Sequence, residues 1–373
     1  MLCLEVKDRC RFAAPVDVEA DRYIDMKKIH GFLDAIERRF PGEKTPGYVC
    51  AVIREGEVEL ERTFGYANLE WDAPVAKDTI FHIGSETKQF TACLILRLID
   101  EGWLGLEDDA RSILDYCRDF PYELRIVDLV RHTAGVADYV SKNVEILDAH
   151  GDVATGFAGG KSYFGMARAR QAIAERSALQ SRPCREFAYS NSNYIILADV
   201  VERIAGKDFA SVADDYIFGP LGMKCSFFET ARSRVVQRRA TAYAPDLRKP
   251  GKYLSKFKNF DVVGDVGLLT SADDLVKWER NFWNDALPPG GVIKGMLSFP
   301  AVPRPDDLMY GCGMEFGNVS GAPYISHGGR MDGFKCVILR MTGPRVSFIY
   351  LSNCDVPFIS SEAIGREIAS LCA

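Results

Sequence analysis

Residues 88–103 are apolar on nearly every side when they are read as a helix. Such a helix has no polar face to turn toward water, so other elements must cover most of its surface. The apolar run at 92–99 is far shorter than the roughly 20 residues that a membrane-spanning helix needs, and Arg97 interrupts it. We therefore predict a protein that does not enter a membrane and that folds around a buried helix.

The other patterns place strands near both ends of the chain and helices between them. Residues 48–67 alternate apolar and polar around a turn at Glu55 and Gly56, which predicts a hairpin. A helix is expected after Ser271 and a final one at about 359–371. Further strands are predicted at 323–327, 333–341 and 345–353. Further helices are predicted near 124–131, 164–179, 193–205 and 208–217.

This order predicts an α/β domain made from both ends of the chain, with a mostly helical domain inserted. We assign 1–20 to an N-terminal extension, 21–103 and 261–373 to the α/β domain, and 104–260 to the helical domain. Within the helical domain, residues 231–258 carry nine Lys or Arg against a single Asp. We interpret this basic segment as a solvated loop face; the alternative is a rim that attracts an anionic substrate.

The composition limits the partners. The 373 residues carry 46 Lys and Arg against 52 Asp and Glu, and this net charge of -6 disfavours binding to nucleic acid through bulk positive charge. The start of the chain lacks the unbroken apolar stretch of an export signal, and the 11 cysteines include no C-x-x-C pair, so we predict a cytoplasmic protein. With nucleic acid disfavoured by the charge, we expect a small-molecule or short-peptide substrate. The histidines show no metal-ligand spacing, so we expect no metal, and we expect no cofactor.

The string SETK at 85–88 is an S-x-x-K element that opens the buried helix. Positions i and i+3 share one helical face, so the Lys88 amine can reach the Ser85 hydroxyl as a proton acceptor. Gly84 allows a sharp entry into the helix. Burial would lower the pKa of the lysine toward the range in which a neutral amine serves as a base. The alternative is an ordinary N-cap serine beside a chance lysine.

Two further elements carry chemical groups. Tyr189 and Asn191 stand at the start of a predicted helix, where asparagine and serine often serve only as caps. His327, Gly328 and Gly329 lie on a predicted strand that is followed by a turn. A single histidine there is more often structural, whereas two missing side chains let another backbone come close.

Together and in this order, the elements resemble the serine β-lactamase and penicillin-binding-protein superfamily, and more closely its branch of class C-like esterases and D-aminopeptidases. The resemblance implies an α+β fold with an antiparallel sheet flanked by helices, an inserted helical domain, and a cleft between them. The strings that carry it are FGYANLEWDAPVAKDTIFHIGSETK, VDLVRHTAGVADY, EFAYSNSNYIILADVVERIAG, GPLGM, GDVGLLTSADDLVKW and YISHGG.

The resemblance also implies roles at matching positions. Ser85 would be the nucleophile that forms an acyl-enzyme, with Lys88 as its base or as the group that tunes the base. Tyr189 would be the second proton carrier, and the order in which Lys88 and Tyr189 act stays open. Asn191 would orient the substrate amide or Lys88. The backbone N–H groups of Ser85 and Arg330 would hold the oxyanion.

One departure from the family pattern bears on the substrate. The members that act on antibiotics carry Lys-Thr-Gly or a close variant where this chain has His327, Gly328 and Gly329. A permanent cation suits a substrate carboxylate, whereas a histidine is mostly neutral at pH 7. Strand alternation turns the Arg330 side chain away if His327 and Gly329 face the cleft. His132, in the string RHTAGV, is expected to fix a helix end and not to catalyse.

We therefore expect a serine hydrolase that forms an acyl-enzyme on a small amide, peptide or ester, either D-aminopeptidase-like or amidase-like, or carboxylesterase-like. β-Lactamase or DD-peptidase activity ranks third. The alternative from another class is a non-catalytic member of the fold that only binds a ligand or self-assembles. The sequence leaves the oligomeric state open.

Overall fold

The computed structural model describes residues 26–140, 164–231, 233–257, 259–354, 366–368 and 370, and the backbone of two short strands, β6 (Glu145–Leu147) and β7 (Val153–Thr155). The predicted N-terminal extension at 1–20 lies outside the described residues. Most of the predicted final helix at 359–371 also lies outside them, and its described residues 366–368 and 370 are helical.

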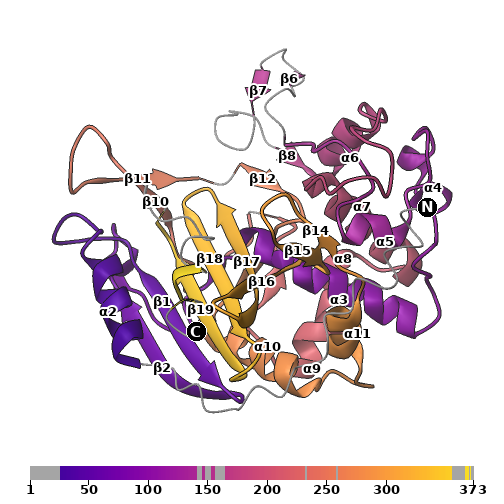
Figure 1. Ribbon diagram of the computed structural model, residues 1–373. Helices are drawn as coiled ribbons and strands as arrows, with labels where there is room; N and C mark the ends of the chain where they lie inside the picture. Colours follow the sequence, from indigo (N-terminus) through magenta and orange to yellow (C-terminus); the bar gives the residue numbers. More distant parts are fainter. Residues whose placement is uncertain are drawn as a thin grey trace.

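The main sheet has eight antiparallel strands in the order β14–β15–β16–β17–β18–β19–β1–β2 (Figure 1). The predicted hairpin joins the C-terminal strands because β1 pairs with β19, from Tyr48 opposite Ser352 to Arg54 opposite Val346. Both ends of the chain thus build one sheet, and the predicted α+β fold class is confirmed. The strands are β1 (Tyr48–Arg54), β2 (Glu57–Phe64), β14 (Val302–Pro303), β15 (Met309–Gly311), β16 (Met314–Val319), β17 (Ala322–Met331), β18 (Phe334–Met341) and β19 (Val346–Ser352).

Helices cover both faces of this sheet, which explains why β1 is an almost continuous apolar run. The even-numbered residues of β1 pack in one cluster with α2 (Met26–Glu37). The odd-numbered residues pack in a larger cluster with α3 (Thr87–Asp100) and α10 (Ala272–Asn284). Ser271 caps α10, as predicted, by accepting from the N–H of Asp274.

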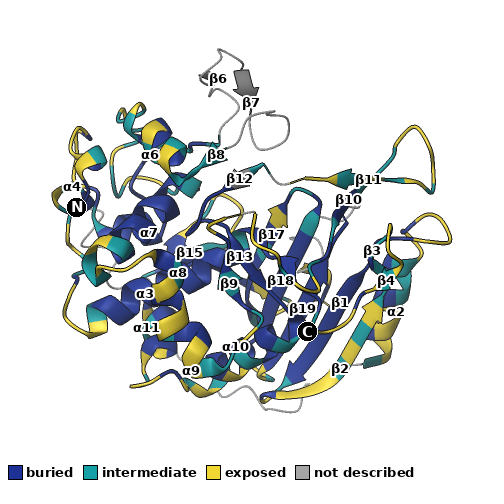
Figure 2. Ribbon diagram, turned by 180° about the vertical axis from the view of Figure 1, so that it is seen from behind, coloured by how far each residue is buried: buried dark blue, intermediate teal, exposed yellow. Residues whose placement is uncertain are grey.

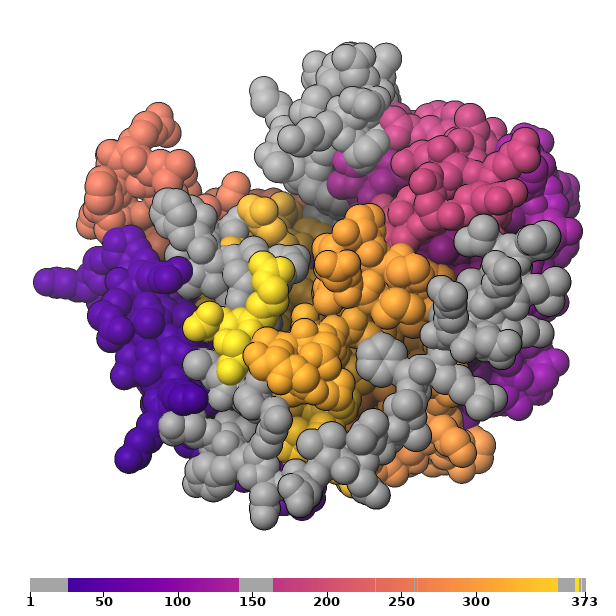
Figure 3. Space-filling model, in the orientation of Figure 1, coloured from indigo at the N-terminus to yellow at the C-terminus, as the bar shows by residue number. Residues whose placement is uncertain are grey.

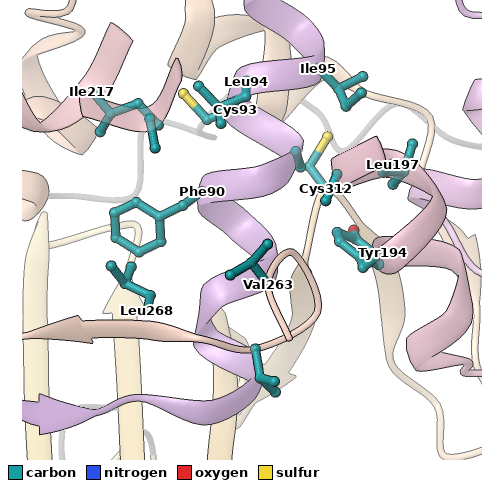
Figure 4. Packing of buried hydrophobic residues seen from close by; sticks show 14 of the residues in the cluster. Phe90, Cys93, Leu94, Ile95, Tyr194, Leu197, Ile217, Val263, Leu268 and Cys312 are labelled. Atoms are coloured by element: carbon teal, nitrogen blue, oxygen red, sulfur yellow. The ribbon is translucent and has the colours of Figure 1, made fainter. Parts of the chain in front are cut away.

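Helix α3 is the predicted buried helix. All of its residues from Thr87 to Leu98 are buried. Figure 4 shows Phe90 and Ile95 leaving it on opposite sides, each toward apolar residues of other elements. In Figure 2 both α3 and its neighbour α7 (Asn191–Ala205) are largely dark blue. In the described part of the chain, no helix has the length and apolar character needed to cross a membrane.

Helices and short strands fill the middle of the chain. Each predicted helical segment there contains a helix, although most are shorter than the periodicity indicated. The helices are α4 (Ala110–Ile113), α5 (Ile126–Val130), α6 (Met166–Ala174), α7, α8 (Phe209–Ala213), a π-turn (Asp214–Phe218) and α9 (Gly219–Leu221), with α11 (Val292–Ser298) further on. The short strands are β3 (Tyr66–Asn68), β4 (Ala73–Pro74), β5 (Phe81–His82), β8 (Phe164–Gly165), β9 (Phe227–Phe228), β12 (Phe260–Asp261) and β13 (Leu268–Thr270).

The basic segment at 231–258 differs from the expected loop because it contains a hairpin, β10 (Ala242–Pro245) and β11 (Tyr253–Lys256). Hydrogen bonds tie this hairpin to the N-terminal part of the chain: the Tyr253 hydroxyl donates to the Pro41 carbonyl, and the Ser255 hydroxyl donates to Glu70. In Figure 3 it stands beside the indigo residues and apart from the magenta helical segment. The limits of the two domains stay a prediction.

A buried ion pair joins the sheet to the helices behind it. Arg340 of β18 donates to both carboxylate oxygens of Glu279 in α10, at 2.6 and 2.8 Å, and both side chains are almost fully buried. The same guanidinium donates to Gln89 of α3 at 2.8 Å. Removing one partner of such a pair leaves an uncompensated charge in the interior.

Replacing Arg340 with Met therefore leaves the Glu279 carboxylate buried without its partner. We expect the free energy of unfolding to fall by about 3–5 kcal/mol, measured by urea unfolding followed by circular dichroism. The matched control is Arg54→Met, which removes the more exposed pair between Arg54 and Glu59 and should cost no more than about 1 kcal/mol. Equal losses in the two variants would contradict this account.

Candidate active site

Ser85 lies on a tight turn between β5 and α3. Residues Gly84–Glu86 form a single 3-10 turn that runs directly into α3. Gly84 has a φ of +57°, and its N–H donates to Nδ1 of His82 at 3.0 Å. A Cβ on Gly84 would lie 2.5 Å from the backbone nitrogen of Arg330, so glycine is what lets β17 approach this turn. The Ser85 side chain stays partly exposed.

Lys88 is completely buried in the first turn of α3. Its Nζ lies 3.1 Å from Oγ of Ser85 and 2.9 Å from Oδ1 of Asn191. A third contact, also 2.9 Å long, joins Nζ to the backbone oxygen of Asp265. Loss of water around the amine lowers the pKa of Lys88 from 10.5 to about 8, against the opposing influence of the Asp265 and Asp138 charges.

These three contacts orient the neutral form of the amine. A neutral amine has two N–H donors and one lone pair. The carbonyl oxygen of Asp265 and the amide oxygen of Asn191 can only accept, so they take the two N–H groups. The lone pair is then directed at Ser85, whose hydroxyl can donate. The geometry thus suits Lys88 to accept the Ser85 proton.

Asp138 holds the Asn191 amide in the orientation that Lys88 needs. Nδ2 of Asn191 donates to Oδ2 of Asp138 at 3.0 Å, while Oδ1 faces Lys88. The N–H of Val140 donates to the other oxygen of the carboxylate at 2.9 Å. Burial raises the pKa of Asp138, against these donors and the Lys88 charge. No local pattern singles out Asp138, because it lies 53 residues from Asn191 in the chain.

Tyr189 brings a phenol to Ser85. The Lys88 Nζ lies 5.0 Å from the centre of the Tyr189 ring. Removal of water raises the pKa of Tyr189 above its ordinary value of 10, although a hydrogen bond with Ser85 acts in the opposite direction. The phenol therefore keeps its proton at neutral pH. This favours Lys88 over Tyr189 as a proton acceptor and leaves the phenol able to donate a proton.

The buried ring of His132 supports Tyr189 from behind, with the two ring centres 4.4 Å apart. Its Nδ1 accepts from the Ser190 N–H at 3.3 Å and from the Asn193 amide at 2.9 Å. Nε2 therefore carries the proton, which it donates to the Tyr310 hydroxyl at 3.2 Å. Burial holds the pKa of His132 well below 6.5. Since Ser190 is the N-cap of α7, the ring fixes a helix end, as expected.

Strand β17 brings the His-Gly-Gly string to the turn that carries Ser85. A Cβ on Gly329 would lie 1.8 Å from the carbonyl oxygen of Ile83, so the predicted close backbone approach is confirmed. The buried His327 ring donates from Nδ1 to the Gly328 carbonyl at 2.7 Å. Residue Arg330 is exposed on the following position of the strand.

The structure gathers the predicted site residues around this turn, and their catalytic roles stay a prediction. They are Ser85, Lys88, Tyr189, Asn191, His327, Gly328, Gly329 and Arg330. Asp138, Asp265 and Tyr310 are additional, and they have no sequence signal beyond their presence in or near the motif strings. Over the described ranges, no group of three or more His, Cys, Asp or Glu side chains could hold a metal ion.

A comparison with known families decides the relationship. The Beta-lactamase family model matches residues 33–371, which is most of the chain. The chain belongs to the beta-lactamase family. The resemblance drawn from the ordered motifs is therefore confirmed.

Individual members of this family show the same relationship. The D-aminopeptidase of Gluconobacter oxydans is 28% identical over 327 residues, which cover 87% of this chain and 58% of the relative. The D-aminopeptidase of Brucella canis is 26% identical over 330 residues, covering 88% and 60% of the two chains. This beta-lactamase family chain thus spans about three fifths of the length of these curated relatives.

Solved structures share the fold. The octameric penicillin-binding protein homologue from Pyrococcus abyssi has a TM-score of 0.79 at 23% identity, covering 93% of this chain and 77% of that chain. The D-amino acid amidase from Ochrobactrum anthropi SV3 has a TM-score of 0.74 at 19% identity, covering 93% and 97%. Both place the chain in the beta-lactamase fold.

The contact between Gly329 and Ile83 gives a test of the site's architecture. In Gly329→Ala the new methyl group collides with a backbone carbonyl, so we expect the free energy of unfolding to fall by about 1–3 kcal/mol, as measured by urea unfolding. The control is Gly343→Ala, whose Cβ would meet no heavy atom within 4 Å. Unchanged stability in Gly329→Ala would show that β17 does not press on the turn.

Proposed function

We propose that the chain is a serine hydrolase that forms and hydrolyses an acyl-enzyme on a small amide, peptide or ester. The arrangement of the buried Lys88 amine carries the proposal. The oxygens of Asn191 and Asp265 can only accept its two N–H groups, so its remaining contact is to the partly exposed Ser85 hydroxyl. A lysine that only supports a fold keeps its charged end in water or in an ion pair, whereas this arrangement lowers its pKa and activates a nucleophile.

In the proposed acylation, Oγ of Ser85 attacks the substrate carbonyl carbon while Lys88 takes the hydroxyl proton. The carbonyl oxygen becomes an oxyanion, held by the backbone N–H groups of Ser85 and Arg330. The position of the Arg330 nitrogen next to Gly84 supports this pair of donors. Losing one donor of this kind typically costs about 10²–10³ in rate.

The leaving group then needs a proton, which we assign to Tyr189. Its phenol contacts Ser85 and is protonated at neutral pH. The proton that Lys88 has gained can replace the one that Tyr189 gives up. In deacylation water takes the place of the leaving group, and the same residues act in the reverse order. Asn191 keeps the Lys88 amine oriented throughout.

The proposed substrates are amides and short peptides of D-configured amino acids. Two observations support this class: the D-aminopeptidases among the curated relatives, and a histidine at position 327 whose Nδ1 proton is already donated to Gly328. Without a fixed cation at this point, the free carboxylate of a β-lactam or of a peptide C-terminus has a poorer site. Carboxylesterase activity is the second candidate, because an ester presents the same carbonyl to Ser85.

We further propose that the protein works in the cytoplasm and that a small substrate is its partner. The cysteines that the structure describes are all free thiols. Free thiols in this number suit a reducing compartment.

The nucleophile can be tested directly. Wild-type protein should react covalently with a fluorophosphonate probe and hydrolyse D-aminoacyl p-nitroanilides faster than the L-forms. Ser85→Ala should lose both activities, because the group that attacks is gone. Gel fluorescence and p-nitroaniline release measure the two effects.

The matched control is Ser255→Ala, which alters the serine of the second S-x-x-K string, in the β10–β11 hairpin, and should leave both activities unchanged. Equal labelling of the wild type and Ser85→Ala would place the nucleophile elsewhere. A wild type that neither reacts with the probe nor turns over amides or p-nitrophenyl esters would favour the binding-only alternative.

The pH dependence follows from the lowered pKa of Lys88. Only the neutral amine accepts a proton, so kcat/KM should rise with pH and level off above a midpoint near pH 8. Measurement of D-aminoacyl anilide hydrolysis between pH 5.5 and 9.5 gives the profile. Lys88→Arg should lack the rise, because a guanidinium does not deprotonate in this range. A wild-type rate that falls as pH rises through 8 would exclude Lys88 as the base.

A further inference from the structure

The turn between β12 and β13 fixes Asp265 beside Lys88. The carbonyl oxygens of Gly264 and Asp265 accept from Thr91 and Lys88, which lie one turn apart on α3, at 2.7 and 2.9 Å. Gly264 has a φ of +104°, and a Cβ there would lie 2.4 Å from the carbonyl oxygen of Tyr194. The turn is therefore wedged between α3 and α7, and its backbone has little freedom to move.

The Asp265 side chain is a buried carboxyl group that the proposed reaction does not yet use. It is 0% exposed. Its Oδ2 accepts from the Tyr139 hydroxyl at 2.9 Å, the backbone N–H of Val266 also acts to lower its pKa, and its Oδ1 has no hydrogen-bond partner of normal geometry within the described residues. A carboxylate buried with so few donors is unfavourable by itself. Such a group needs a compensating charge nearby, and Lys88 supplies one when it is protonated.

We propose that Asp265 is a positioning residue for the base: its buried negative charge stabilises the ammonium that forms on Lys88 when Lys88 takes the proton of Ser85. The inference rests on the proposed function. No proton moves to Asp265. The Ser85 O–H bond breaks as Oγ bonds to the substrate carbon, a new N–H bond forms on Lys88, and this proton later replaces the one that Tyr189 gives to the leaving group.

The surroundings of Lys88 single out Asp265 from the other groups. Those that titrate and face Lys88 are Asp138, Asp265, Tyr189, Tyr194 and His132. The two tyrosines and His132 are neutral near pH 7, since burial raises the pKa of the phenols and lowers that of the imidazole. Asp138 is partly exposed, and both of its oxygens accept hydrogen bonds.

Asp265 is screened least, because no part of it reaches water. Burial raises the pKa of Asp265 to about 6, with the Lys88 charge acting to lower it. The carboxyl is therefore ionised at neutral pH. The reciprocal effect of its charge is to raise the pKa of Lys88, so Asp265 makes the amine a stronger base than burial alone would leave it.

The test is the pH dependence of covalent labelling by a fluorophosphonate in Asp265→Asn. The asparagine oxygen can still accept from Tyr139, but the charge is lost. We expect the midpoint of the labelling rate to move to lower pH by about one unit or more, and the rate on the plateau to fall because the base is weaker. A merely structural role would lower the plateau and leave the midpoint in place.

The matched control is Thr91→Val. It removes the other hydrogen bond between α3 and the same turn but changes no charge, so its midpoint should equal that of the wild type. Tyr139→Phe is a second variant that leaves Asp265 in place. Loss of the Tyr139 donor raises the pKa of Asp265, so Asp265 carries its charge for a smaller fraction of the time. The midpoint of the labelling rate should therefore fall, by less than in Asp265→Asn.

The outcomes separate the two proposals. A midpoint that stays unchanged or rises in Asp265→Asn overturns the inference while the proposed function stands. If Asp265→Asn does not fold, an unchanged midpoint in Tyr139→Phe overturns it equally. A wild type that is not labelled at any pH overturns the proposed function and the inference together.

Discussion

The structure depends on the burial of one amine. Lys88 is completely enclosed, and its Nζ is surrounded by the Ser85 hydroxyl, the Asn191 amide oxygen and the Asp265 carbonyl oxygen. An ammonium in such a place has lost its water, so burial disfavours the charged form. With a pKa lowered to about 8, the neutral amine, which is the form that accepts a proton, becomes accessible close to neutral pH. In the proposed mechanism, the burial of this side chain therefore also supplies the base.

The oxygens around Lys88 come from distant parts of the chain, so its contacts form only when these parts pack against one another. Asn191 and Asp265 lie 103 and 177 residues away from it. The same helix reaches the sheet on its other side, where Gln89 accepts from Arg340 and Glu86 accepts from the N–H of Ile338. Helix α3 and the turn before it thus connect Ser85, α7 and β18 through neighbouring residues. Ser85 is held by contacts that the whole core maintains.

The sequence predicts those features that local chemistry determines. The Ser85 and Lys88 pairing follows from helical spacing, and the terminal hairpin follows from alternation around a Glu-Gly turn. Asp138 and Asp265 could not be found in this way, because what makes them part of the site is folding against residues far along the chain. The basic segment at 231–258 was missed as a hairpin because its strands are only four residues each, too short to show a clear alternation. Each motif alone is a weak local pattern. Their order along the chain is what made the resemblance to a family recognisable.

The His327-Gly328-Gly329 string illustrates how one strand can meet two unrelated demands. Position 329 requires glycine, because any side chain would collide with the Ile83 carbonyl and push β17 away from Ser85. We propose that the residue at 327 bears on the substrate; the His327 ring is buried, with one nitrogen committed to a neighbouring carbonyl. With a lysine at 327, Gly329 would still be needed for the close approach of β17, whereas the charge offered at position 327 would differ. On this proposal, exchange of the residue at 327 would change which substrates are accepted while Ser85, Lys88 and the approach of β17 stay as they are, because the close approach depends on Gly329.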